Sequence, residues 1–130
     1  MKKIIIDTNF LMLPIQFRVD IFSEIDRICN FSYKLYIFDK SIDELNNIIK
    51  NQPQKHKKAA QFALKMVKLK NIGIIKSEKK NVDVLILNNL SKDTIVATQD
   101  SSLKKKLLEK GASVIILRQK KYLQLARKAL

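Results

Sequence analysis

Four carboxylates stand where this chain could hold a divalent metal ion, and they are Asp7, Glu44, Asp83 and Asp100. The first and the last follow short apolar runs typical of buried strands. The other two lie in the early turns of segments with helical spacing. Carboxylate oxygens are the ligands that Mg²⁺ and Mn²⁺ prefer, so the four residues together predict an oxygen-ligated metal site.

Each of these residues alone also has a structural explanation. Asp7 could close its own turn, and Asp83 could favour a helix that starts after Asn81. Glu44 could complete a capping box with Ser41 as the N-cap. Four carboxylates that converge in a protein with a formal charge of +14 would nevertheless repel one another unless cations neutralised them. The set as a whole therefore favours a metal centre.

The elements that must position these side chains alternate between strand and helix. Five short runs rich in Ile and Val are the expected strands, at residues 3–6, 34–38, 71–75, 94–97 and 113–117. The expected helices include residues 54–70, 82–90 and 103–110, the last of them ended by Gly111. Because parallel neighbours need crossover connections, the alternation predicts an α/β fold, with three α/β/α layers and a mostly parallel five-stranded sheet. Ligands of such sheets bind beyond the carboxyl ends of the strands, where Asp7 and Asp100 are expected.

Length and composition are those of one domain over residues 1–130, of which 46% are hydrophobic. No apolar run approaches the ~20 residues that cross a bilayer, and Asp7 comes too early for a secretory signal. We therefore expect a cytoplasmic protein with no membrane partner. Cys29 and His56 are single residues of their kinds, which again leaves oxygen ligands for any metal.

The basic charge is concentrated in the second part of the chain. Residues 1–50 hold seven Lys or Arg and seven Asp or Glu, whereas residues 51–130 hold 19 and five. A field of this size attracts polyanions such as RNA, DNA or anionic lipid, although a lysine-rich surface kept for solubility is an alternative. The residues we expect to contact phosphates are Lys104, Lys105, Lys106, Lys120 and Lys121.

The order and spacing of the motifs resemble those of the PIN-domain ribonucleases. The motifs are Ile4-Ile5-Ile6-Asp7-Thr8-Asn9, Ser41-Ile42-Asp43-Glu44-Leu45, Val82-Asp83 and Ile95-Val96-Ala97-Thr98-Gln99-Asp100. The resemblance covers nearly the whole chain, and it is strongest to archaeal PIN proteins similar to pre-ribosomal RNA processing nucleases and to VapC-type toxins. It implies a ribonuclease that acts on single-stranded RNA with Mg²⁺ or Mn²⁺ bound by the four carboxylates. Thr8, Asn9 and Thr98 would assist them.

One departure from the family leaves an alternative open. Relatives often carry two adjacent acids at the helix position, whereas here Val84 follows Asp83. A catalytically weak PIN-fold protein that binds RNA or assists assembly in ribosome maturation is therefore the main rival. A phosphoryl-transfer domain is disfavoured because Asn9 stands where a haloacid phosphatase needs a second acid. A homodimer and an antitoxin partner stay open.

Overall fold

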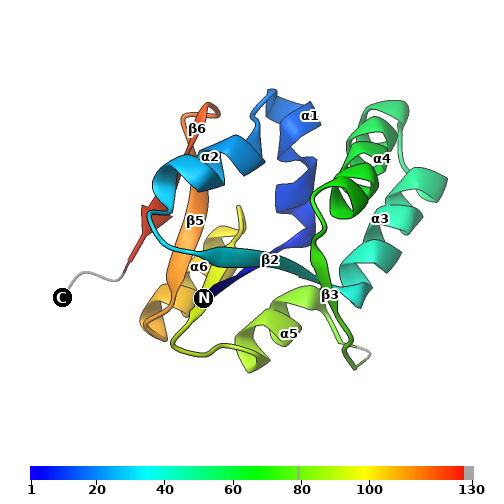
Figure 1. The fold of residues 1–130 in the computed structure, drawn as a ribbon. Coiled ribbons are helices and arrows are strands. Elements are labelled where there is room, and N and C mark those ends of the chain that lie inside the picture. Colours follow the sequence, from blue (N-terminus) through cyan, green and yellow to red (C-terminus); the bar gives the residue numbers. More distant parts are fainter. Residues whose placement is uncertain (79, 128–130) are drawn as a thin grey trace.

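The computed structural model describes residues 1–78 and 80–127, and these form a six-stranded sheet between two layers of helices (Figure 1). The strands are β1 (Lys2–Ile6), β2 (Tyr33–Phe38), β3 (Gly73–Ile75), β4 (Thr94–Ala97), β5 (Ser113–Arg118) and β6 (Tyr122–Ala126). Their order in the sheet is β3-β2-β1-β4-β5-β6. All neighbours are parallel except β5 and β6. The predicted α/β/α fold with a mostly parallel sheet is confirmed.

The helices divide between the two faces of the sheet (Figure 1). One face is covered by η1 (Thr8–Met12), α1 (Leu13–Phe17), α2 (Ile21–Ile28), α3 (Asp39–Asn51) and α4 (Gln54–Leu69). The other face is covered by α5 (Val82–Asn88) and α6 (Ser101–Glu109). Among the described residues, no helix is long and apolar enough to cross a membrane.

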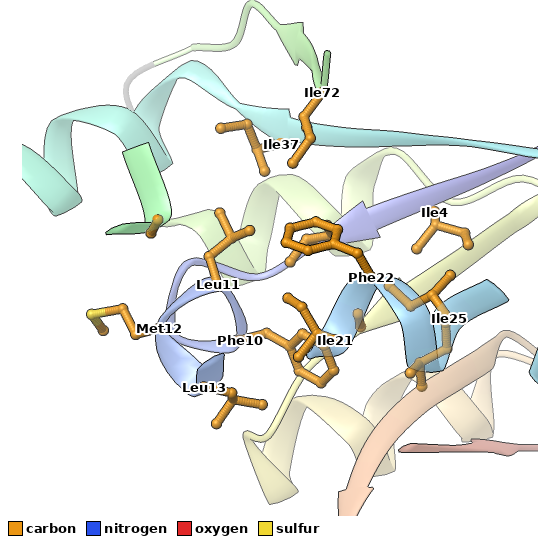
Figure 2. Packing of buried hydrophobic residues seen from close by; sticks show 14 of the residues in the cluster. Ile4, Phe10, Leu11, Met12, Leu13, Ile21, Phe22, Ile25, Ile37 and Ile72 are labelled. Atoms are coloured by element: carbon orange, nitrogen blue, oxygen red, sulfur yellow. The ribbon is translucent and has the colours of Figure 1, made fainter. Parts of the chain in front are cut away.

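Strand β1 lies at the centre and is buried on both faces. Ile4 and Ile6 pack into the larger core with side chains of η1, α2 and α4, part of which Figure 2 shows. Ile5 points the other way, into the smaller core beneath α5 and α6. All three side chains are at most 1% exposed, which explains why this strand reads as an unbroken apolar run. Burial on both sides fixes the register of β1 and thus the place of the residue that follows it.

Strand β6 was not predicted, because the turn before it lacks the usual sequence signal. Gln119 and Lys120 both have positive φ, at 52° and 57°, in the tight turn that joins β5 to β6. Turns of this kind normally carry Gly, Asn or Asp at such positions. The expected cap at Gly111 is confirmed, since its φ is +81° and its N–H donates to the Leu108 carbonyl.

The outer edge of β6 is bonded by two side chains of α2. Glu24 Oε1 accepts a hydrogen bond from the Leu123 N–H at 2.9 Å, and Arg27 Nη2 donates to the Leu123 carbonyl at 3.0 Å. The two side chains also pair with each other at 2.8 Å. Together they stand in for a neighbouring strand on an otherwise open edge. The hydrogen bond from Arg27, with that from Leu123, lowers the pKa of the Glu24 carboxyl.

We predict that Glu24→Ala lowers the free energy of unfolding by about 1 to 2 kcal/mol at neutral pH, because a backbone N–H loses a charged acceptor. The change in the free energy of unfolding is measured by urea denaturation. The pKa of Glu24 is lower in the folded state, so its contribution is present above the unfolded pKa and is lost as the pH falls through the folded pKa. The exposed Glu109, changed to Ala, is the control, and an equal loss in both variants would contradict the proposed role of Glu24 at the β6 edge.

Candidate active site

Three neighbouring strands deliver acidic residues to one edge of the sheet. Asp7 follows β1 directly, and its N–H donates to the Ala97 carbonyl at the end of β4 at 2.9 Å. Asp100 is the N-cap of α6, where its side chain accepts the Leu103 N–H at 3.0 Å. Glu44 lies in the second turn of α3, the helix that starts directly after β2. These strands are adjacent and parallel, so their carboxyl ends bring the three residues to the same edge.

Thr98 connects Asp7 to the start of α6. Its side chain is 0% exposed, and its hydroxyl donates to Asp7 Oδ2 at 2.8 Å. The same hydroxyl oxygen accepts the Asp100 N–H at 3.1 Å. Asp7 Oδ1 accepts the Thr8 N–H at 2.9 Å, so each oxygen of this carboxylate has a donor. The orientation of the Asp7 side chain is thus fixed by its neighbours.

Thr8 holds the second carboxylate in the same manner. Its hydroxyl donates to Glu44 Oε1 at 2.7 Å and lies 2.7 Å from the Ser41 hydroxyl. A threonine hydroxyl has one proton and a carboxylate can only accept, so we assign the donor of the second bond to Ser41. Thr8 and Ser41 are buried, which makes this chain of hydroxyls part of the core beneath the site.

The expectation that Ser41 is a helix N-cap was wrong. Helix α3 begins at Asp39, two residues earlier, and Phe38 occupies the cap position without a side-chain hydrogen bond. Ser41 lies inside the first turn and faces η1, where it bonds Thr8. The sequence pattern of a capping box therefore marks a contact between two elements rather than the end of one.

The charge on Asp7 is held in unfavourable surroundings. Removal of the carboxyl from water raises its pKa above the ordinary value, and the negative charges of Glu44 and Asp100 raise it further. Hydrogen bonds from Thr98 and Thr8 oppose this rise in part. Asp7 therefore lies close enough to both Glu44 and Asp100 for their charges to act on it. A cation bound among them would remove both penalties on the charged form.

The donors at this edge fit magnesium or manganese by their type. They are carboxylate and hydroxyl oxygens, which hard divalent cations prefer, and the like charges that raise the pKa of Asp7 favour a bound cation. As the side chains of residues 1–78 and 80–127 stand, however, no three Asp, Glu, His or Cys groups form a ready cage. The edge around Asp7 thus offers suitable ligand atoms for a divalent cation, but the described side chains do not form a complete coordination sphere.

Two predicted site residues form no hydrogen bond with this group among the described residues. Asp83 is exposed in the first turn of α5. Asn9 is also exposed. The roles of both residues stay predictions. Of the predicted phosphate contacts, Lys104 is half-buried and Lys105, Lys106, Lys120 and Lys121 are exposed.

Asp39 is a residue at this edge that the sequence reasoning missed. It follows β2 directly, as Asp7 follows β1, so the sequence carries the same signal at both positions. Its carboxylate accepts hydrogen bonds from the hydroxyl and the N–H of Ser77, and the hydroxyl bond is the main reason that its pKa is lowered. Asp39 thereby ties the segment after β3 to the start of α3.

Comparisons with known proteins agree with the fold. Residues 4–120 match the family described as "PIN like domain". Ribonuclease VapC4 of Methanocaldococcus jannaschii is 33% identical over 127 residues, which cover 96% of this chain and 97% of that protein. The fold is similar to that of the PIN domain endonuclease Utp24, with a TM-score of 0.78 and 18% identity over 98% of this chain and 95% of the other.

We predict that Asp7→Asn raises the melting temperature at neutral pH when chelator is present. The raised pKa means that the folded wild type loses stability as the pH rises from the ordinary value of an aspartate through the raised value. Asparagine carries no charge to desolvate, so the advantage of the variant should shrink as the pH falls below the unfolded pKa. Thermal unfolding from pH 3 to pH 8 measures this trend.

The control for this prediction is Asp93→Asn, because Asp93 is exposed and pairs with Lys2. That variant should show no gain in melting temperature. A lower melting temperature for Asp7→Asn at neutral pH would mean that the hydrogen bonds of Asp7 outweigh its burial and the repulsion.

Proposed function

Since the chain belongs to the PIN-like domain family, as its motifs predicted, we propose that it is a metal-dependent endoribonuclease that hydrolyses RNA phosphodiester bonds. The observation that carries the proposal is the convergence of Asp7, Glu44 and Asp100 at one edge of the sheet, where hydroxyl groups orient the first two. Burial and the neighbouring charges raise the pKa of the Asp7 carboxyl. A carboxylate that is costly to ionise in the free protein is well suited to bind a cation. The 33% identity to a protein named as a ribonuclease supports the same activity.

In this proposal Asp7, Glu44 and Asp100 hold Mg²⁺ or Mn²⁺, and Asp83 completes the acidic set. The bound metal would supply an activated water and charge stabilisation at the leaving oxygen of the phosphodiester. Thr8 and Thr98 position the carboxylates through the hydrogen bonds described above.

The lysines that follow the site would hold the RNA strand. Helix α6 starts next to Asp100, so Lys104, Lys105 and Lys106 lie within its first two turns. Lys120 and Lys121 lie at the turn between β5 and β6. Such contacts bind phosphates without regard to sequence, and we propose single-stranded RNA as the substrate.

A catalytically weak protein that binds RNA or assists ribosome maturation is the second proposal. It is favoured by Val84, which stands 38% exposed beside Asp83 where relatives often carry another acid, and by the lack of a ready cage among the described residues. The two proposals share the fold and the basic surface. They differ in whether RNA is cut.

We further propose a cytoplasmic setting, either in RNA processing or as the toxin of a toxin–antitoxin pair. The relative named VapC4 favours the toxin, which would be held by an antitoxin protein, while a homodimer is the other assembly we propose. Co-expression with the product of the adjacent gene, followed by size-exclusion chromatography, distinguishes the two assemblies.

We predict that freshly added Mn²⁺ or Mg²⁺ supports cleavage of single-stranded RNA and that chelator stops it. Asp7→Asn and Asp100→Asn should each lower the rate by roughly two orders of magnitude, because each removes a charged ligand. Asp83→Asn should lower it at least about tenfold if the fourth acid takes part. Gel analysis of end-labelled RNA products measures the rates.

Glu109→Gln controls for loss of an exposed carboxylate, because Glu109 lies at the opposite end of α6 from Asp100 and forms no ion pair among the described residues. Equal activity in wild type and Asp7→Asn would identify a contaminating nuclease. In that case the RNA-binding proposal would replace the nuclease.

We also predict that Mn²⁺ raises the melting temperature of the wild type more than that of Asp7→Asn. A ligand that binds only the folded state stabilises it in proportion to the logarithm of its concentration. This measurement tests the metal site without reference to activity, and equal shifts in both proteins would place the ion elsewhere.

A further inference from the structure

Two lysines lie directly opposite each other on β1 and β2, far from the carboxylates. Lys3 pairs in register with Lys34, and both side chains are exposed. Like charges in such a pair destabilise a sheet. Both ammonium groups lie over the ring of Tyr36, at 5.3 and 5.5 Å from its centroid. The two positive charges are thus held close together beside a single aromatic ring.

The ring of Tyr36 owes its position to the neighbouring strand. A Cβ at Gly73 would come within 2.6 Å of the Tyr36 ring, so only glycine lets the ring lie across β3. The interaction of the ring with two cations offsets part of their mutual repulsion.

A basic hollow of about 890 Å³ adjoins this pair at the amino-terminal edge of the sheet. Its cations are Lys2, Lys92, Lys110 and Arg127, and Phe31 and Leu90 are among its apolar lining residues. Thr94, which also lines the hollow, is the register partner of Lys3 on β4. Lys3 and Lys34 do not line the hollow but lie beside it across this pairing, and we call the hollow and the lysine pair together the amino-edge surface.

The charges of the amino-edge surface are largely uncompensated. Among the described residues, Lys2 has a carboxylate within 4.0 Å, that of Asp93 at 3.6 Å, and the other cations named here have none. Four cations around the hollow and two more beside it would repel one another, and an anion with several regularly spaced charges would relieve this repulsion.

We propose that the amino-edge surface binds the phosphate backbone of single-stranded RNA at a distance from the cleavage edge. The choice of RNA as the ligand rests on the proposed function. The amino-edge surface would add a second RNA contact to the one proposed for the lysines of α6. Lys2 begins β1 and Asp7 directly follows its end, so the two regions are separated by roughly 16 Å at ~3.3 Å per residue. One RNA strand can contact both if it runs along the molecule from one edge of the sheet to the other.

The test measures the affinity for a fifteen-nucleotide single-stranded RNA by fluorescence anisotropy, in the Asp7→Asn background without divalent metal. Lys3→Gln with Lys34→Gln, and separately Lys92→Gln with Lys110→Gln, should each weaken binding about tenfold at low salt. Each double variant should also reduce the salt slope by about 1.4, which is two contacts at 0.7 each for a single strand. The matched control is Lys65→Gln with Lys68→Gln, two exposed lysines of α4.

The control removes the same charge and should change affinity by less than twofold. A loss as large in the control would show a general charge effect and would overturn the proposal, as would unchanged affinity in both amino-edge variants. Lys3→Gln with Lys34→Gln should also keep or raise the melting temperature, because it removes a like-charge pair, whereas a fall would assign the pair to stability. If these variants weaken binding but the wild type does not cleave RNA, the surface stands and the nuclease proposal fails.

Discussion

The pairing of β1 with β4 brings together the residues on which the candidate site depends. Ile6 is in register with Ala97, so the residues that follow these two strands, Asp7 and Thr98, meet at the edge of the sheet. Burial of β1 on both faces holds this register, since a slip by one residue would turn its apolar side chains toward the wrong layers. The hydrogen bond from Thr98 to Asp7 is thus a consequence of how the core packs.

Negative and positive side chains gather at opposite ends of the parallel strands. Acidic residues gather beyond the carboxyl ends of β1 and β4, while lysines and Arg127 surround the opposite end of the same sheet. A parallel sheet makes this separation natural, because all the starts of its parallel strands lie at one edge and all the ends at the other. An RNA strand attracted to the basic end would still need a cation at the acidic end to approach Asp7 without repulsion.

Local patterns in the sequence predicted the strands and the acids that follow them. A buried strand is a run of consecutive apolar residues, and its end is the point where polar residues begin. The parallel sheet, the cap at Gly111 and the bounds of β4 follow from such patterns. Features that depend on pairing between distant segments were not predicted. The bond of Ser41 to Thr8, the tie from Asp39 to Ser77 and the opposition of Lys3 and Lys34 all join segments about 30 to 40 residues apart. Strand β6 was missed for a local reason, since its turn uses residues that seldom adopt positive φ.

The choice of threonine and serine as partners of the carboxylates has a chemical consequence. A lysine beside Asp7 would neutralise it and leave little reason for a metal to bind, whereas a hydroxyl orients the carboxylate and leaves its negative charge in place. Thr98 and Thr8 each give one such bond, to Asp7 and Glu44 respectively, and both threonines are buried where water cannot compete. In a chain of charge +14, the absence of an ion pair to Asp7 or Glu44 among the described residues is a specific feature of this edge. No lysine in the described part of the chain neutralises these two carboxylates, so they keep the negative charge that the proposed divalent cation would require.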